Sequence, residues 1–85
     1  MSEEIVGVVK TYFSKIGVAA LEVTQGKITL GDTLKFKGHT TQFEMTLSSM
    51  QKDNQAIQEA KPGDLIGIKV PERVRENDTV IKVTP

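Results

Sequence analysis

The chain has 85 residues, which is the length of one small domain, spanning residues 1–85. It carries 11 Lys and Arg residues against 11 Asp and Glu residues, and this zero net charge argues against nucleic-acid binding through bulk positive charge, although a local basic patch stays open. No cysteine is present, which excludes disulfides, thiolate metal sites and cysteine catalysis.

The start of the chain, Met1 to Glu4, is acidic, whereas a secretory signal begins with basic residues followed by apolar ones. No apolar run approaches the ~20 residues that a membrane-spanning helix needs. We therefore expect a cytoplasmic protein without a membrane partner.

The first predicted strands are apolar on both faces. Residues 5–9 and 16–21 are almost wholly apolar, which is typical of strands that are covered on two sides. Gly7 and Gly17 lie inside these runs, where glycine permits a sharp bend or a close backbone approach. Residues 12–15 between them are expected to form a short connection or hairpin.

The rest of the chain shows the period-two alternation of half-buried strands. Leu34 and Phe36 alternate with two lysines, and the run from residue 42 to residue 48 alternates in the same way before its phase changes after Leu47. Two more apolar rows follow at residues 66–70 and 81–83. Helical patterning is almost absent, so we interpret residues 53–60 as a loop that Ile57 anchors to the core, with room for one strand-like or helical turn.

Turn residues separate these runs at close spacing. Gly and Asn tolerate positive φ, and an Asp side chain bonds nearby backbone amides, so backbone capping explains the three aspartates better than carboxylate chemistry does. The residues assigned to structural turns are Gly26, Gly31, Asp32, Gly63, Asp64, Asn77 and Asp78.

Short strands with frequent turns predict an all-β fold, a small antiparallel β-barrel of about six strands, because closure removes exposed edges. Replacing Phe36 or Phe43 with Ala is expected to cost about 3–5 kcal/mol. The predicted core comprises Val8, Val18, Leu21, Val23, Ile28, Leu34, Phe36, Phe43, Met45, Leu47, Ile66, Ile68, Val70 and Val80.

Three segments, in order, resemble a known family. Residues 26–32 (GKITLGD) are similar to the G-x-I-x-x-G-D stretch in the second domain of translational GTPases of the elongation factor and initiation factor two type. Residues 57–68 and 74–80 resemble the two later Gly-Asp turns of that domain, with Asn77 in place of a glycine. The resemblance implies a stand-alone copy of this β-barrel and a contact with tRNA or ribosomal RNA.

The resemblance does not extend to GTPase activity. No G-x-x-x-x-G-K-[ST] motif is present, so the chain has no phosphate cradle, and we expect no nucleotide and no cofactor. His39 is the only histidine, and neither metal-binding nor catalytic partners accompany it in the sequence. The chain is therefore predicted not to be an enzyme.

A small group of basic residues is the candidate nucleic-acid site. Tyr12 and Phe13 add aromatic faces that stack on bases in RNA-binding proteins. The alternative is that the lysines protect outer strands against aggregation and that Phe13 belongs to the core. Arg73 and Arg75 are balanced by acids in the same loop, which favours solvation over function. The candidate residues are Lys10, Lys15, Lys35, Lys37 and His39.

Two functional hypotheses remain open. The first is a non-catalytic module that associates with RNA or the translation machinery. The alternative is a protein-interaction module that docks on a larger enzyme, because the same barrel type resembles an accessory domain of other enzymes, including peptidases linked to RNA modification.

Overall fold

The structure, a computed structural model, describes residues 2–84 as strands joined by turns, with no helix among them. The all-β prediction is confirmed. The predicted number of about six strands is too low, because four strands have only two or three residues and carry no visible alternation. The strands are β1 (Ser2–Phe13), β2 (Val18–Val23), β3 (Ile28–Thr29), β4 (Thr33–Lys37), β5 (Gln42–Thr46), β6 (Met50–Lys52), β7 (Gln55–Ile57), β8 (Glu59–Ala60), β9 (Leu65–Lys69) and β10 (Thr79–Thr84).

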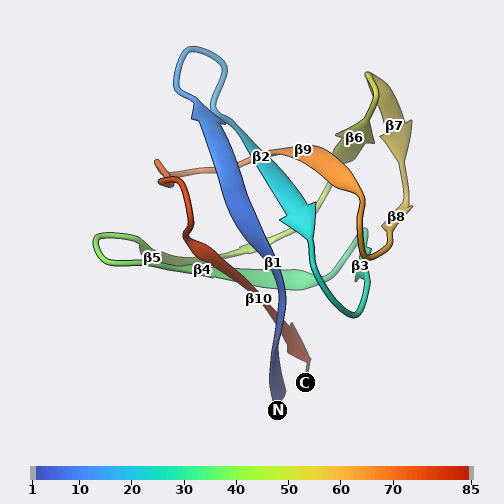
Figure 1. The fold of residues 1–85 in the computed structure, drawn as a ribbon, viewed down its shortest axis with the longest axis horizontal. Helices are drawn as coiled ribbons and strands as arrows, with labels where there is room; N and C mark the ends of the chain where they lie inside the picture. The colour runs from blue at the N-terminus through green and yellow to red at the C-terminus, as the bar shows by residue number, and fades with distance from the viewer. Residues whose placement is uncertain (1, 85) are drawn as a thin grey trace.

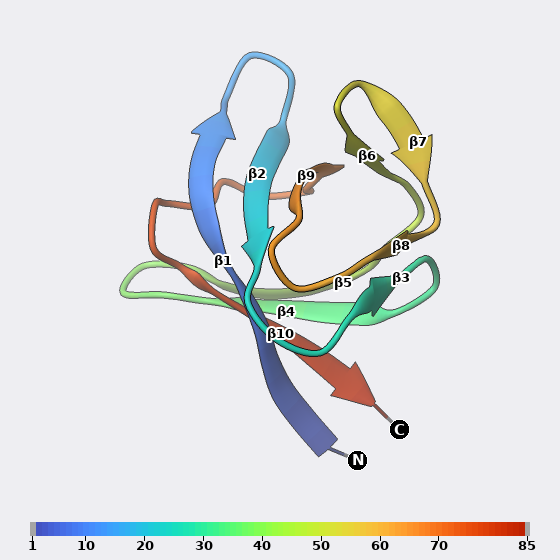
Figure 2. The ribbon, with the colours of Figure 1, turned by 45° about the vertical axis from the view of Figure 1, so that its right-hand side comes forward.

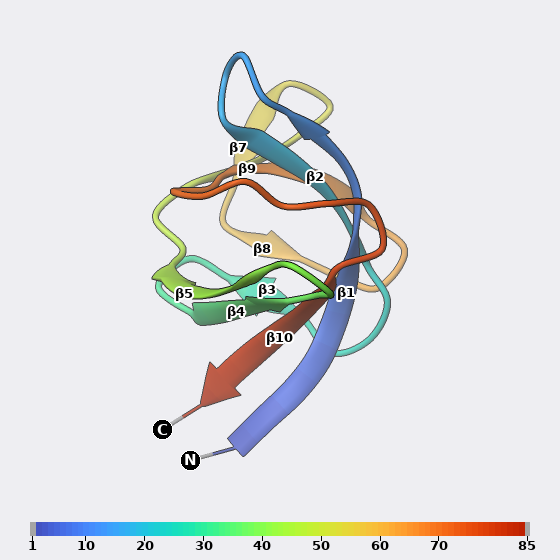
Figure 3. The same ribbon diagram turned by 90° about the vertical axis from the view of Figure 1, so that its left-hand side faces the viewer.

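Eight strands form one antiparallel sheet in the order β5-β4-β10-β1-β2-β9-β6-β7, and β3 pairs separately with β8. The sheet curls around the core (Figure 1; Figure 2). From the side, β2 and β9 lie across the interior from β4 and β5 (Figure 3). Within residues 2–84 the edge strands β5 and β7 do not pair with each other, so the sheet is barrel-like but open between them.

Two bulges in β1 decide which of its valines face the core. The pairing register with β10 shifts between Ile5 and Gly7, and the register with β2 shifts between Val9 and Thr11. Each bulge adds a residue and changes the phase of the side chains. Val6 and Val9 are therefore fully buried, whereas Val8, which was predicted in the core, is only half-buried.

Most of the other predicted core residues are buried, and the exceptions lie on or near open surfaces. Phe43 and Met45 belong to the edge strand β5 and are half-buried, as are Val18 and Val70. Phe43 stacks on Phe36 with ring centroids 4.9 Å apart. The predicted residues that are buried are Leu21, Val23, Ile28, Leu34, Phe36, Leu47, Ile66, Ile68 and Val80.

The segment at residues 53–60, predicted as a loop with at most one strand-like or helical turn, takes the strand-like form and belongs to a tight hairpin. Strands β6 and β7 pair around Asp53 and Asn54, whose φ values are 53° and 65°. Two-residue hairpin turns of this hand require positive φ at both positions, and Asp and Asn adopt it more readily than most residues do. Ile57 packs against the core, as the sequence indicated.

The two glycines of the first apolar runs have different roles. Gly7 lies inside β1, where an added Cβ would stand 2.6 Å from the backbone oxygen of Glu22, so only glycine permits this strand spacing. Gly17 does not lie in a strand: it ends the turn after Phe13 with φ at 65°. The predicted connection at residues 12–15 therefore begins two residues later, because β1 continues through Phe13.

The first apolar runs are not covered on both faces. The side chain of Ile5 in β1 is 52% exposed, and that of Ile16, which lies in the turn before β2, is 63% exposed. Two-sided burial was a wrong expectation, because one face of the curled sheet packs on the core, while no other element of residues 2–84 covers the outer face of these strands.

Candidate interaction surface

The three aspartates of the predicted turns bond to the backbone. In each turn, carboxylate Oδ2 accepts a hydrogen bond from the amide three residues earlier, at 2.8 Å for Asp32 and 2.9 Å for Asp64 and Asp78. A side chain committed to its own turn has little freedom for chemistry on a ligand. The residue before each aspartate, Gly31, Gly63 or Asn77, has positive φ, as does Gly26.

Two of the candidate nucleic-acid-binding lysines lie in ion pairs. Lys10 Nζ is 3.2 Å from the Glu22 carboxylate, and Lys35 Nζ is 3.4 Å from the Glu3 carboxylate. Each carboxylate offsets the positive charge that would attract the phosphate backbone of a nucleic acid. Lys10 and Lys35 are also separated by β10, because β4 and β1 do not neighbour each other in the sheet.

The other three candidate residues are exposed but lie at two different hairpins. Lys15 lies in the turn between β1 and β2. Lys37 ends β4, and His39 lies in the following turn. These turns project in different directions from the sheet, so the structure brings Lys37 and His39 near each other but does not bring Lys15 to them (Figure 1).

A surface that the sequence interpretation missed lies on the outer face of β1, β2 and β9 and on the turn that joins β1 to β2. Three large apolar side chains are exposed there, at 49% for Phe13, 63% for Ile16 and 56% for Leu65. Phe13 is thus not a core residue. Val18 and Ala20 lie between them and are half-buried. We call Phe13, Ile16, Val18, Ala20 and Leu65 the outer apolar patch.

Strand pairing makes this patch continuous. Phe13 is the register partner of Val18, and Leu65 is the partner of Glu22, two residues along the same outer face from Ala20. A shallow depression of about 380 Å³ is lined by four of the five patch residues. The available signal was the apolar run at residues 16–21, which was interpreted as covered on both sides.

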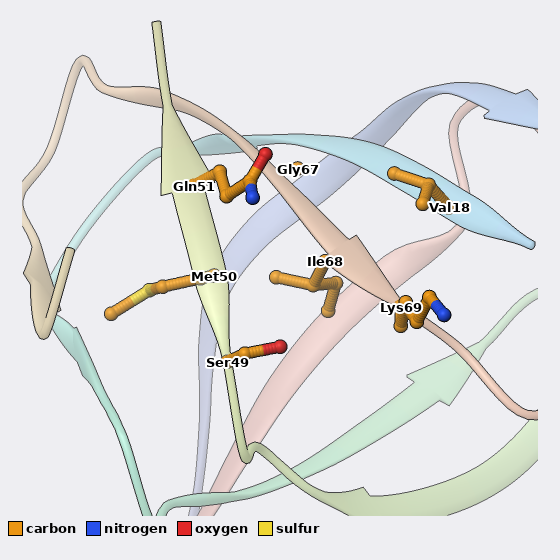
Figure 4. Close-up of a pocket in the computed structure, with 7 residues that line it drawn as sticks. All are labelled: Val18, Ser49, Met50, Gln51, Gly67, Ile68 and Lys69. Carbon is orange, nitrogen blue, oxygen red and sulfur yellow. The ribbon is translucent and has the colours of Figure 1, made fainter. Parts of the chain in front are cut away.

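A second depression extends the patch toward β6. It has a volume of about 170 Å³ and lies where β6 and β9 diverge, since the two strands pair only at Gln51 and Gly67. Figure 4 shows Gln51 beside Gly67, with Val18 and Lys69 at the other end of the pocket. Val18, Gln51 and Gly67 line both depressions, so the two adjoin each other, and we call them together the groove.

One ion pair holds the β6–β7 hairpin to the turn before β9. Lys52 Nζ lies 2.8 Å from Asp64 Oδ1. The hydrogen bond from Lys52, followed by that from the Lys61 amide, lowers the pKa of Asp64 below its usual value of 3.8. The same bond raises the pKa of Lys52 above 10.5. This pair therefore fixes the rim of the groove near Leu65.

Residues 2–84 contain no cluster of three or more His, Asp or Glu side chains that could hold a metal ion. In that same part of the chain, no helix is long and apolar enough to cross a membrane.

Searches against known proteins point to peptidases. No family model matches the chain. The chain is 32% identical over 72 residues to a collagenase of Porphyromonas gingivalis, covering 84% of this chain and 20% of that protein. It is 34% identical over 76 residues to an uncharacterised protease of Methanocaldococcus jannaschii, covering 88% and 18%. The chain thus spans about a fifth of the length of these curated relatives.

Two solved structures share the fold of this chain. The chain matches the C-terminal domain of a Geobacillus thermoleovorans protein described as a U32 peptidase, with a TM-score of 0.88 and 19% identity. The match covers 95% of this chain and 93% of that domain. A selenomethionine variant of that domain matches with a TM-score of 0.85.

The predicted kinship with the second domain of translational GTPases is wrong. Both the curated relatives and the structural neighbours reported above are peptidase-type proteins. The inferred translation-factor role, ribosome association and RNA binding lose their basis, because they were taken from that resemblance. What the comparisons support is the alternative, a module similar to one part of a larger peptidase-type protein.

Proposed function

We propose that this chain is a non-catalytic accessory module that works with a catalytic unit of the U32 peptidase type. The observation that carries the proposal is the pair of matches at 32% and 34% identity to proteins named collagenase and protease, each about five times longer than the matched segment. The fold of a C-terminal domain from a U32 peptidase supports it. In this proposal, peptide hydrolysis belongs to the catalytic unit.

The outer apolar patch is the proposed contact with that catalytic unit. A partner that covers these side chains gains about 25 cal/mol of binding free energy for each Å² of apolar surface that it removes from water. Ile16 and Leu65 are more than half exposed, and both line the same depression. Contiguous exposed apolar residues indicate an interaction site, whereas single scattered ones are normal on a protein surface. Contiguous apolar surface with a groove is the form that a buried interface core takes.

The test is binding to the collagenase of Porphyromonas gingivalis from which the segment matching this chain has been removed. We expect a complex in sedimentation velocity, and we expect Leu65→Ser or Ile16→Ser to weaken it at least tenfold, because interface anchors carry most of the binding free energy. Ile5→Ser is the matched control, since Ile5 is 52% exposed on the same face of the sheet but lies outside the patch.

Two results would contradict the proposal. One is the absence of a complex, or equal weakening by Ile5→Ser. The other is hydrolysis of gelatin by the isolated chain, which would place catalysis in the module itself.

A further inference from the structure

A separate pocket lies at the end of β1 away from the chain terminus, between that strand and the connection from β9 to β10. Its volume is about 280 Å³. The lining is polar and includes two guanidinium groups, which distinguishes it from the groove of the outer apolar patch. The lining residues are Thr11, Tyr12, Ser14, Arg73, Val74, Arg75 and Glu76.

The backbone holds this pocket in shape. The amide of Asn77 donates to the Val9 oxygen at 2.8 Å, and the amide of Val9 donates to the Asp78 oxygen at 2.9 Å. Val74 is 1% exposed and anchors the middle of the connection in the core. The connection therefore runs past the upper half of β1 before it turns into β10 (Figure 1). Its two arginines line the same pocket as Thr11 and Ser14.

The two arginines are available to a ligand. Arg75 Nε donates a hydrogen bond to Thr40 Oγ1 at 2.9 Å, which orients the guanidinium group. Its two terminal nitrogens can then donate to a ligand. Within residues 2–84, neither Arg73 nor Arg75 belongs to an ion pair. Glu72 and Glu76, the acids that the sequence analysis expected to balance these arginines, therefore form no ion pair with them in residues 2–84.

The charge of the pocket favours an anion. Two guanidinium groups and the Glu76 carboxylate sum to one positive charge, which a single carboxylate neutralises. A planar guanidinium pairs with a carboxylate through two parallel hydrogen bonds. The hydroxyl groups of Thr11, Tyr12 and Ser14 supply further donors.

An apolar depression adjoins this pocket. It is lined by residues 12–16 of the β1–β2 hairpin and shares Tyr12 and Ser14 with the arginine pocket. Phe13 and Ile16, the exposed apolar side chains of this hairpin, both line the depression. A ligand with a carboxylate in one pocket can place a neighbouring apolar side chain in the other.

We propose that the pocket at Arg73 and Arg75 binds a carboxylate of a peptide that carries an apolar side chain beside it. The carboxylate comes either from the end of the peptide chain or from an acidic side chain, and the two sources share the same chemistry. The two arginines lie outside the outer apolar patch, whereas Phe13 and Ile16 belong both to that patch and to the adjoining depression. The carboxylate site therefore does not require the accessory role, and it is tested on the chain alone.

The test is a titration of the ¹⁵N-labelled chain followed by NMR. The probes are N-acetyl-Ala-Leu with a free carboxylate, its C-terminal amide, and N-acetyl-Asp-Leu-amide, which offers only a side-chain carboxylate. We expect at least one carboxylate probe to shift the Nε signals of Arg73 and Arg75 and the amide of Ser14, with millimolar affinity. Binding of the first probe alone assigns the site to chain termini, and binding of the third assigns it to acidic side chains.

Arg73→Gln and Arg75→Gln are each expected to weaken binding about fivefold, the value of an exposed ion pair near 1 kcal/mol. Lys61→Gln is the matched control, because it also removes one positive charge. Lys61 lies in the turn that bonds to Val23, at the end of β2 away from the pocket, so the variant is expected to leave binding unchanged. Equal binding of the amide probe, tighter binding of inorganic phosphate, or equal weakening by Lys61→Gln would each overturn the proposal. The Arg73→Gln variant is expected to keep the complex with the catalytic unit, which separates the two proposals.

Discussion

The carboxylate of Asp78 occupies the space that a side chain at position 38 would need, so that a Cβ added to Gly38 would overlap Asp78 Oδ1. Asp78 is only 5% exposed, and its other oxygen accepts the Arg75 amide at 2.9 Å. This contact joins the β4–β5 hairpin to the turn that precedes β10, two segments far apart in the sequence.

Gly38→Ala is therefore expected to lower the free energy of unfolding by about 2 kcal/mol, because the carboxylate must move away from a cramped site. Chemical denaturation measures this loss. In the Gly38→Ala/Asp78→Ala double variant the clash is gone, so the combined loss is expected to be smaller than the sum of the two single losses. Strictly additive losses would contradict the contact.

The two stacked phenylalanines are expected to differ in their effect on stability. Phe36 is fully buried, and Phe36→Ala is expected to cost about 3–5 kcal/mol. Phe43 is half-buried on the edge strand, so Phe43→Ala is expected to cost about 2 kcal/mol, less than the sequence alone suggested. Thermal melts of both variants test the difference, and equal losses would show that the β5 edge is covered.

The Lys52–Asp64 pair is expected to give a pH dependence of stability. The folded-state pKa of Asp64 is lowered, so its stabilisation is present above the unfolded value near 3.8 and is lost as pH falls through the folded value. The pKa of Lys52 is raised, so its stabilisation is present below 10.5 and is lost as pH rises through the folded value.

Denaturation of the unmodified chain and of Lys52→Met across this pH range provides the measurement. The difference in the free energy of unfolding between them is expected to be constant from about pH 5 to pH 9 and to shrink below about pH 4. A difference that persists unchanged at pH 2 would show that Lys52 acts through packing of its methylene chain.

Asn77 tests the backbone requirement of the third turn. Its φ is 71°, a conformation that costs an ordinary residue about 1–2 kcal/mol. Asn77→Ala is expected to destabilise the chain by about 1 kcal/mol. Asn77→Gly is expected to remain within about 0.5 kcal/mol of the unmodified chain, because Gly adopts this φ freely but loses more backbone entropy on folding. Equal stability of Asn77→Ala and Asn77→Gly would contradict the argument.

The same three turns explain why the family was misjudged from the sequence. Asp32, Asp64 and Asp78 each close a turn through a hydrogen bond to the backbone, and the residue directly before each aspartate has positive φ. That pattern solves a local problem of entering a strand, so it is not specific to one family, and a shared fold does not carry a shared function. The motifs therefore indicated turn geometry correctly, while the function taken from them was wrong.

The sequence by itself determined the longer strands and the three aspartate turns, because alternation and turn residues act locally: Leu34 and Phe36 face the core, while Lys35 and Lys37 face away from it. Only the tertiary structure decided what depends on distant partners. The bulges of β1 buried Val6 and Val9 in place of Val8, and the ion pairs of Lys10 and Lys35 formed with acids on other strands. Whether the outer face of β2 and β9 is covered depends on what packs over it, and no local pattern carries that information.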